Sequence, residues 1–290
     1  MITRNPMQFK AIIKNKAKEK NISAQLVMQN YMLERLLERI SLSPYRHNFI
    51  LKGGFLIAAV VGLGSRTTMD MDTTIKGFTL SHESIKKIFE EVCNIPVDDD
   101  ITFEVSGVAD IRETDDYPGI RVNLMAKYSP INVPLTVDVT TGDVITPKEI
   151  EFTFPMMFDD RNLSVLAYNL ETVVAEKIET VLSRSIANTR PRDFYDIYII
   201  YTLHREKIDF DILRRAFDKT IQKRGSNHIL RDYSEILGDI QNSKEQFEFW
   251  KKYQKNYSYV NNISFADTCD VIEKIMDELY GGKCSVKFSR

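Results

Sequence analysis

The sequence predicts an α+β protein, in which a mixed β-sheet with covering helices is followed by a helical C-terminal region. Apolar residues recur every three or four positions before residue 62 and again after Pro155, but they alternate with polar residues between Thr67 and Phe154. A length of 290 residues is typical of two domains. The change of period near residues 155–165 therefore predicts one domain over residues 1–160 and a second over residues 161–290.

The composition excludes several classes of protein. Hydrophobic residues make up 43% of the chain and charged residues 28%, which is unlike a disordered chain or a collagen-like fibre. No apolar run approaches the roughly 20 residues that span a bilayer, and the lysine-rich N-terminus lacks the apolar core of a signal peptide. The three cysteines offer neither a disulfide framework nor a zinc-binding spacing. We therefore expect a cytoplasmic protein with no membrane partner.

The first part of the chain is expected to be helical. The first fifty residues show helical periodicity, and Ser43-Pro44 closes this segment. The apolar positions of the periodic part are Leu26, Tyr31, Leu33, Leu36, Leu37 and Ile40. An apolar stretch follows, in which Phe49-Ile50-Leu51 and Lys52-Gly53-Gly54 precede a buried helix over Phe55–Val61.

Alternation predicts half-buried strands over residues 69–75, 121–127 and 135–140. Met69, Met71 and Ile75 are expected to face the core. Turns such as Tyr117-Pro118-Gly119 join the strands, and an amphipathic helix over residues 81–93 separates the first two. After Pro155 we expect helices near residues 170–184, 191–204, 209–224, 241–255 and 264–280, where Pro191 suits a first helical position.

The net charge of −2 conceals local runs of opposite sign. Residues 1–40 hold eight basic and three acidic residues, residues 97–116 hold one basic and eight acidic residues, and residues 203–256 hold twelve basic and nine acidic residues. Such runs are typical of solvated surface faces. The alternative is a basic surface near each end of the chain that contacts nucleic acid.

Asp70 and Asp72 form the strongest local feature. Residues two apart in a strand point to one face, so the two carboxylates lie side by side and repel each other unless a cation lies between them. Mg²⁺ is the natural partner, because it binds one or two carboxylates and keeps waters and phosphates as its other ligands. Asp138, on the polar face of a later strand, could complete a two-metal site for phosphoryl transfer. Solvated strand residues are the alternative.

Two further segments are candidates for binding an anion. Lys52-Gly53-Gly54 stands at the start of an apolar helix, where backbone amides and the helix N-terminus favour a phosphate, although a tight turn uses the same glycines. Lys177 falls on the apolar stripe of the helix over residues 170–184, so its ammonium must either reach water or meet an anion such as a triphosphate.

The segment Arg190-Pro191-Arg192-Asp193-Phe194-Tyr195-Asp196 carries charge at the start of a helix. Asp193 falls in the first turn, where a carboxylate is favourable, and Asp196 lies one turn later. The two arginines either bind phosphate or pair with these acids in a capping network. The four scattered histidines form no Ser/His/Asp or Cys/His arrangement, so nucleophilic hydrolysis is not indicated.

Taken together, these segments resemble the AbiEii/AbiGii nucleotidyltransferase-like toxins. Residues 49–54, followed by Arg66-Thr67-Thr68-Met69-Asp70-Met71-Asp72, resemble the first motif of that family. Ala175-Glu176-Lys177-Ile178 resembles its lysine-bearing helix, and residues 192–197 (RDFYDI) resemble its RDxxD motif. Residues 31–40 also resemble the upstream helix of the family. The resemblance runs from about residue 25 to residue 205, with the segments in the family's order.

The resemblance implies a DNA-polymerase-β-like nucleotidyltransferase core and a helical domain that completes the active-site cleft. It further implies the toxin half of a toxin–antitoxin pair tied to abortive phage infection. The implied substrate is an NTP, with GTP as a candidate, the implied cofactor is Mg²⁺ as one or two ions, and the implied acceptor is RNA at the tRNA 3′ end. The cognate antitoxin need not contact such a toxin directly.

By position, the resemblance implies roles for individual residues. Asp70 and Asp72 match the metal-binding pair and Thr68 lies beside the phosphates, whereas the third position, Asp138, varies among such enzymes. Lys177 matches the essential lysine, and Asp193 or Asp196 matches the late essential aspartate. The further candidates for nucleotide binding are Lys52, Gly53, Gly54, Arg66 and Arg192. Phe55 departs from the small residue usual after Gly-Gly, which puts a side-chain phosphate contact there in doubt.

The leading hypothesis is thus a Mg²⁺-dependent nucleotidyltransferase toxin that transfers NMP from an NTP to an RNA end. Two alternatives stay open at this point. The acceptor could be a protein or a small molecule, or the chain could be a nucleotide-binding module without turnover. The choice of base, the oligomeric state and the choice between Asp193 and Asp196 as the essential aspartate also stay open.

Overall fold

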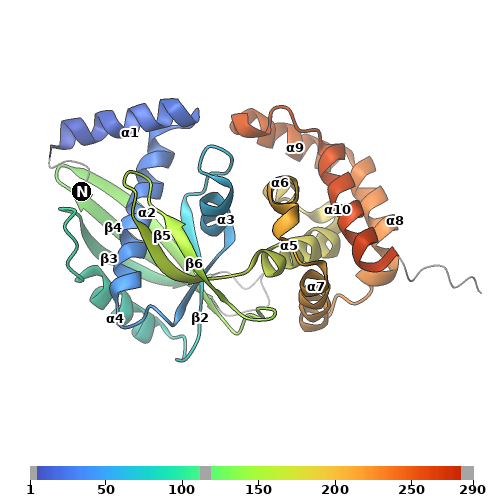
Figure 1. The fold of residues 1–290 in the computed structure, drawn as a ribbon, viewed down its shortest axis with the longest axis horizontal. Coiled ribbons are helices and arrows are strands. Elements are labelled where there is room, and N and C mark those ends of the chain that lie inside the picture. The colour runs from blue at the N-terminus through green and yellow to red at the C-terminus, as the bar shows by residue number, and fades with distance from the viewer. Residues whose placement is uncertain (1–4, 112–118, 282–290) are drawn as a thin grey trace, which may run out of the picture. The chain divides into compact units, whose positions relative to one another are not determined.

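The computed structural model describes residues 5–111 and 119–281, which divide into two compact units (Figure 1). The first unit takes in the described residues up to Asp143 together with Glu149–Tyr168, and it holds the β-sheet. The second takes in Val144–Lys148 and the described residues from Asn169 onward, and it is helical. The predicted α+β class with a helical C-terminal region is confirmed. The turn expected at Tyr117-Pro118-Gly119 falls largely outside the described residues.

Within the described residues, seven strands form one mixed sheet in the order β3-β4-β5-β2-β1-β7-β6. β2 pairs with β5 and β1 pairs with β7 in parallel, and the other neighbours are antiparallel. The strands are β1 (Phe49–Lys52), β2 (Asp70–Ile75), β3 (Thr102–Asp110), β4 (Gly119–Tyr128), β5 (Ile131–Thr141), β6 (Ile150–Pro155) and β7 (Asn162–Ala167).

The two faces of the sheet differ in polarity, as the alternation predicts. Met71, Val122 and Val137 are completely buried on one face, against helices α2 (Ala24–Leu42) and α4 (His82–Cys93). The other face carries the acidic residues that alternate with them. The expectation for Met69 is wrong, because β2 begins one residue later and the Met69 side chain is 45% exposed.

The N-terminal region contains two helices and one strand, where the sequence suggests helix throughout. Helix α1 (Pro6–Lys20) ends at Asn21, which adopts a left-handed conformation with φ 52°. The Ser23 side chain then caps α2. The apolar stretch after α2 forms β1 and then helix α3 (Gly53–Val61). β1 escapes the sequence prediction because its four residues, three of them apolar, form too short a run to show the alternation of a strand.

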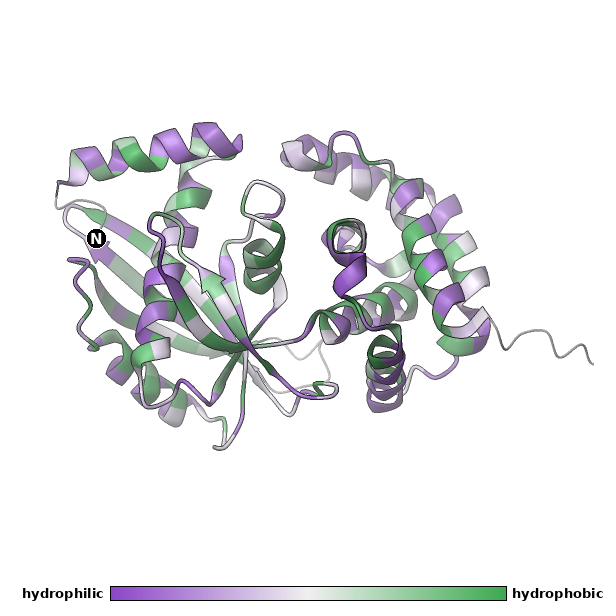
Figure 2. Cartoon of the chain, viewed as in Figure 1, coloured by the Kyte–Doolittle hydropathy of each residue, from purple (hydrophilic) through white to green (hydrophobic). Residues whose placement is uncertain are grey.

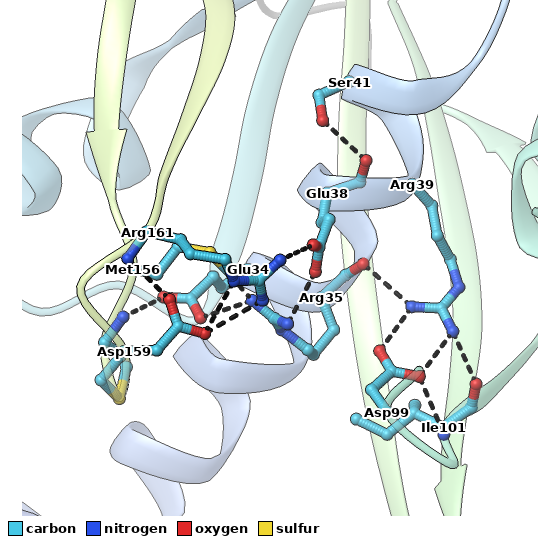
Figure 3. A network of polar contacts seen from close by, with 11 residues as sticks. Glu34, Arg35, Glu38, Arg39, Ser41, Asp99, Ile101, Met156, Asp159 and Arg161 are labelled. Carbon is cyan, nitrogen blue, oxygen red and sulfur yellow. Dashed lines mark hydrogen bonds and ion pairs between the residues drawn. The ribbon is translucent and has the colours of Figure 1, made fainter. Parts of the chain in front are cut away.

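A network of buried ion pairs fixes α2 within the first unit (Figure 3). The Arg39 guanidinium forms two hydrogen bonds of 2.8 Å with the Asp99 carboxylate, and both side chains are almost fully buried. Arg35 lies between Glu34 and Glu38 on the same helix. Because each of these charged side chains has a partner of opposite charge, the polar face of α2 can be buried as well as its apolar face.

The second unit is built from amphipathic helices, along which hydrophilic and hydrophobic residues alternate (Figure 2). Short 3₁₀ turns follow α5 (η1, Ser185–Ala187), α6 (η2, Arg205–Lys207) and α9 (η3, Ser258–Val260). The helices are α5 (Leu170–Arg184), α6 (Pro191–His204), α7 (Phe210–Arg224), α8 (Ile229–Asn242), α9 (Lys244–Asn256) and α10 (Phe265–Tyr280).

The sequence prediction matches these helices except for α8, which it omits. It also omits β3, β6 and β7. β7 lies in the stretch after Pro155 that was expected to be helical, and its alternation of buried Leu163 and Val165 with exposed Ser164 spans too few residues to stand out. No helix in the described part of the chain is both long and apolar enough to cross a membrane.

Candidate functional site

The turn between β1 and α3 is shaped around the carboxylate of Asp72. Gly53 has φ +63°, a left-handed conformation that favours glycine, and a Cβ there would lie 2.0 Å from Oδ2 of Asp72. The Gly54 amide donates a hydrogen bond of 3.2 Å to the same oxygen. The glycine pair and the second aspartate of the DxD segment thus form one local structure, although eighteen residues separate them in sequence.

The segment before β2 brings the other residues of the first motif to this turn. Thr68 Oγ1 donates a hydrogen bond of 2.6 Å to Asp70 Oδ1. A Cβ on Gly54 would lie 3.0 Å from Thr68 Oγ1 and 3.2 Å from a terminal nitrogen of Arg66. The structure therefore brings together Gly53, Gly54, Arg66, Thr68 and the two aspartates.

Helix α2 holds the backbone of that segment in place. The Asn30 side chain donates a hydrogen bond of 2.7 Å to the carbonyl of Thr68, and the Gln29 side chain donates one of 2.8 Å to the carbonyl of Met69. Both amides are at least 92% buried. The sequence does not single out either residue, because a buried amide on a helix has no distinctive local pattern. They position the first motif without belonging to it.

The two aspartates of β2 lack a protein counter-ion. Neither Asp70 nor Asp72 forms an ion pair with another residue among those the structure describes. Burial and the neighbouring Asp70 carboxylate raise the pKa of Asp72 above its ordinary value, although the Lys52 ammonium partly opposes this rise. The ionised pair is therefore destabilised unless positive charge is supplied from outside the chain.

Lys52 lies beside this pair and is held by three residues. Its ammonium is 2.6 Å from Asp143 Oδ2 and donates a hydrogen bond of 2.7 Å to Thr140 Oγ1. The Tyr168 hydroxyl donates a hydrogen bond of 2.8 Å to the same oxygen of Asp143. Burial alone would raise the pKa of Asp143, but the ammonium and these hydrogen bonds outweigh it and hold the pKa below its ordinary value. Asp143 and Thr140 therefore fix the Lys52 ammonium next to Asp72, the register partner of Lys52.

Asp143 is a site residue that sequence reasoning missed. It follows the end of β5, after Gly142 with φ +79°, so the chain turns sharply there and directs the carboxylate toward β1. The only sequence signal is the Gly-Asp pair after a strand, which is common in ordinary turns. Contact with Lys52 depends on the order of the strands in the sheet, which cannot be read from local sequence.

Asp138 lies next to Asp72 but is paired with an arginine. β2 and β5 are in register at these two aspartates, so their side chains share a face. Arg121 of β4 donates hydrogen bonds of 2.8 and 2.7 Å to the two oxygens of Asp138. The structure thus brings Asp138 to the site with its charge neutralised, in contrast to Asp70 and Asp72. The sequence offered no sign of the Arg121 contact, because it follows from the β4–β5 register.

The donor set fits a divalent cation that keeps other ligands. No group of three or more His, Cys, Asp or Glu side chains within residues 5–111 and 119–281 is arranged to hold a metal ion by itself. Mg²⁺ does not need such a group, because it binds through one or two carboxylates and completes its shell with waters and substrate phosphates. Asp70 and Asp72 are unpaired oxygen donors on one strand face, and they match that requirement.

A second cluster, within the helical unit, joins the lysine of α5 to the aspartates of α6. The Lys177 ammonium is 2.8 Å from Asp193 Oδ1 and 2.7 Å from Asp196 Oδ2. Both aspartates are fully buried, and the lysine side chain is 13% exposed. Arg190 adds an ion pair of 2.9 Å to Asp193. The two predicted motifs of this unit therefore meet.

The charges of this cluster balance within the protein. Burial alone would raise the pKa of Asp193, but Lys177 and Arg190 outweigh it and lower the pKa below its ordinary value. Two cations thus face two carboxylates. Arg192 lies apart from them: it is exposed on α6 and forms no ion pair with a residue in the described part of the chain.

The chain is similar to one protein family and to solved structures. The model of one family, described as nucleotidyl transferase AbiEii toxin of type IV toxin–antitoxin systems, matches residues 35–270. Among solved structures, JHP933 from Helicobacter pylori has a TM-score of 0.49 and 12% identity, over 90% of this chain and 95% of that one. A second H. pylori protein, provisionally assigned as a nucleotidyltransferase, has a TM-score of 0.49 and 13% identity, over 90% and 99%. No curated protein matches the sequence.

Proposed function

This chain belongs to the AbiEii family of nucleotidyl transferase toxins of type IV toxin–antitoxin systems, and we propose that it transfers a nucleoside monophosphate from an NTP to RNA. The proposed acceptor is the 3′ end of tRNA, GTP is the first NTP to test, and Mg²⁺ is the proposed cofactor. We further propose that the toxin acts in the cytoplasm in defence against phage. Its cognate antitoxin would not need to contact it directly.

In this reaction a hydroxyl oxygen of the acceptor forms a bond to the α-phosphorus of the NTP. The bond between that phosphorus and the bridging oxygen to the β-phosphate breaks, pyrophosphate leaves, and the hydroxyl proton passes to solvent. A bound Mg²⁺ would neutralise charge that develops on the phosphate oxygens. Asp70 and Asp72 would hold it, and the N-terminus of α3 at Gly53 would face the phosphates, while the Gly54 amide fixes Asp72.

One observation carries the proposal: the carboxylate of Asp72, which has no ion-pair partner in the described structure, lies against a left-handed glycine at the N-terminus of a helix, and Asp70 shares its strand face. A phosphate–metal complex supplies the positive charge that the carboxylates lack and the anion that the helix end favours. Lys52, fixed by Asp143, adds a charge that can contact phosphate from the adjacent strand. We assign Thr68 and Arg66 to the same phosphate-binding group.

In the helical unit we propose that Lys177, Asp193 and Asp196 are essential. The two buried carboxylates hold the ammonium in one position, so that its exposed part can meet a phosphate. Arg192, exposed and unpaired in the described structure, is a candidate for a further phosphate contact.

The test is incubation of the purified protein with each labelled NTP, Mg²⁺ and total RNA. We expect label on tRNA that requires Mg²⁺ and is lost in Asp70→Asn and Asp72→Asn. Asp160→Asn is the matched control, because Asp160 is an exposed aspartate of the same unit without a partner in the described structure. Unlabelled RNA, or equal labelling by the Asn variants of β2, would refute the proposal. Label that remains on protein after nuclease treatment would indicate a protein acceptor. NTP binding without pyrophosphate release would indicate a nucleotide-binding module without turnover.

A further inference from the structure

The end of α9 and the turn η3 carry unbalanced positive charge. Between Glu248 and Asp267 the chain has three lysines and no acidic residue. All three lysines are exposed. Lys252 and Lys255 form no ion pair or hydrogen bond with any residue that the structure describes. Because no acidic side chain within this segment balances these lysines, the local excess of positive charge attracts an anionic partner.

The same segment presents a cluster of tyrosine rings that contact one another at tilted angles. The ring of Tyr257 lies 4.9 Å from that of buried Tyr253 and 5.4 Å from that of Tyr259. Tyr257 and Tyr259 are half-buried, so part of each ring stays accessible. We call the surface formed by Tyr257, Tyr259, Lys252 and Lys255 the tyrosine face. Rings that are held on one side and accessible on the other can stack with nucleobases.

The tyrosine face adjoins the helix that carries the buried aspartates. The Tyr259 ring lies 5.1 Å from the ring of Tyr195, which stands between Asp193 and Asp196 in α6. At the other end of α9, the Gln246 side chain donates hydrogen bonds of 2.8 and 2.7 Å to the carbonyls of Ile186 and Asn188, just before the RDxxD motif. Helix α9 and the turn η3 therefore contact both the segment just before the motif and a residue within it, inside one unit.

We propose that the tyrosine face binds a single-stranded segment of RNA, with bases stacked on Tyr257 and Tyr259 and phosphates paired with Lys252 and Lys255. This inference rests on the proposed function for the choice of RNA as acceptor. Charge complementarity favours a nucleic acid over a protein partner, because the face combines unpaired lysines with aromatic rings and carries no exposed aliphatic residue. An unpaired RNA end offers the bases that a duplex would keep stacked.

The experiment measures binding of a labelled ten-nucleotide RNA to the full chain, without NTP, as a function of salt. Tyr257→Ala and Tyr259→Ala should each weaken binding about 5- to 100-fold. Tyr257→Phe and Tyr259→Phe, which keep the rings, should bind within about twofold of the wild type. Lys252→Gln with Lys255→Gln should reduce the slope of log affinity against log salt by about 1.4.

Matched controls separate this face from general effects. Lys207→Gln with Lys219→Gln removes the same charge from other exposed positions of the unit, and Tyr201→Ala removes another half-buried tyrosine. The controls should bind RNA as the wild type does. The inference is overturned if the wild type binds no RNA, if it prefers duplex RNA, or if the Ala and Gln variants bind like the controls.

The outcome is separable from that of the transfer assay. Normal labelling of RNA by proteins that lack the tyrosines and lysines would leave the proposed function intact and refute the tyrosine face. RNA binding that depends on this face, without any transfer of label to RNA, would refute RNA as the acceptor and support the tyrosine face as an RNA-binding surface.

Discussion

Replacing Gly53 with alanine tests the central geometry of the site. The added Cβ would lie 2.0 Å from Oδ2, 2.6 Å from Cγ and 2.7 Å from Cβ of Asp72. Because ordinary contacts begin near 3.5 Å, the carboxylate must move by about 1.5 Å, or the turn must open by as much. A misplacement of about 1 Å can reduce the rate of a positioned reaction about 100-fold. We therefore expect kcat/KM of Gly53→Ala to fall at least about 100-fold.

Gly225 allows the cost of placing alanine in a left-handed conformation to be separated from the cost of the contact between the new Cβ and Asp72. Gly225 has φ +68°, close to the +63° of Gly53, but a Cβ there would meet no atom within 4 Å. Alanine in this left-handed region costs about 1–2 kcal/mol, which corresponds to a fall in melting temperature of roughly 2–8 °C. Gly225→Ala should therefore lose stability and keep its activity.

The assay is pyrophosphate release at saturating Mg²⁺ and subsaturating NTP, which reports kcat/KM, and it is run well below both melting temperatures. Thermal unfolding of each variant is measured alongside. Gly53→Ala should lose at least as much stability as Gly225→Ala, and it alone should lose activity. If Gly53→Ala kept activity within about threefold of Gly225→Ala, the position of Asp72 against this glycine would not matter for the reaction, and the reasoning would fail.

Three further outcomes follow from the buried charges. Burial raises the pKa of Glu34 to about 7, above its value of 4.5 in the unfolded chain. The stability that this carboxyl contributes is therefore complete below pH 4.5 and is lost, by about 3 kcal/mol, as the pH rises through 7. Glu34→Gln should abolish this loss when urea unfolding is measured at pH 5 and pH 8. Lys177→Met leaves Asp193 and Asp196 buried without their lysine, and its free energy of unfolding should fall by about 3–5 kcal/mol by the same method. Asp143→Asn should release the lysine of β1 and lower kcat/KM at least about tenfold, and the midpoint of unfolding should also fall because the largely buried ammonium loses its carboxylate partner.

The elements that the sequence predicts well are those whose pattern is both long and local. α5 and α6 are found at their predicted positions because their apolar stripes repeat over several turns and Pro191 marks the start of one. The DxD pair could be predicted because residues two apart in any strand share a face, whatever the strand pairs with. α8 could have been predicted in the same way, because Ile229, Leu237 and Ile240 follow helical spacing and are buried.

The parts of the site that could not be predicted depend on which strands become neighbours. Lys52 meets Asp143 and Arg121 meets Asp138 only because β1 pairs with β2 and β4 pairs with β5. Gly53 illustrates the same limit: the sequence allows either a phosphate loop or a tight turn, and only the approach of β2 shows that its missing Cβ leaves room for a carboxylate. Local sequence gives residue types and faces, whereas pairing partners come from the topology of the sheet.

The two clusters differ in whether their aspartates form ion pairs within the protein. This difference indicates where a ligand must supply positive charge. In the helical unit, Asp193 and Asp196 are matched by Lys177 and Arg190, so they are stable without any ligand. On the sheet, Asp138 is matched by an arginine, which leaves the aspartate pair of β2 without a counter-ion in the described structure. A buried acid without a partner costs free energy in the absence of ligand, and that cost is relieved when a cation binds. The unpaired carboxylates of β2 therefore mark the position at which a metal–nucleotide complex would gain most from binding.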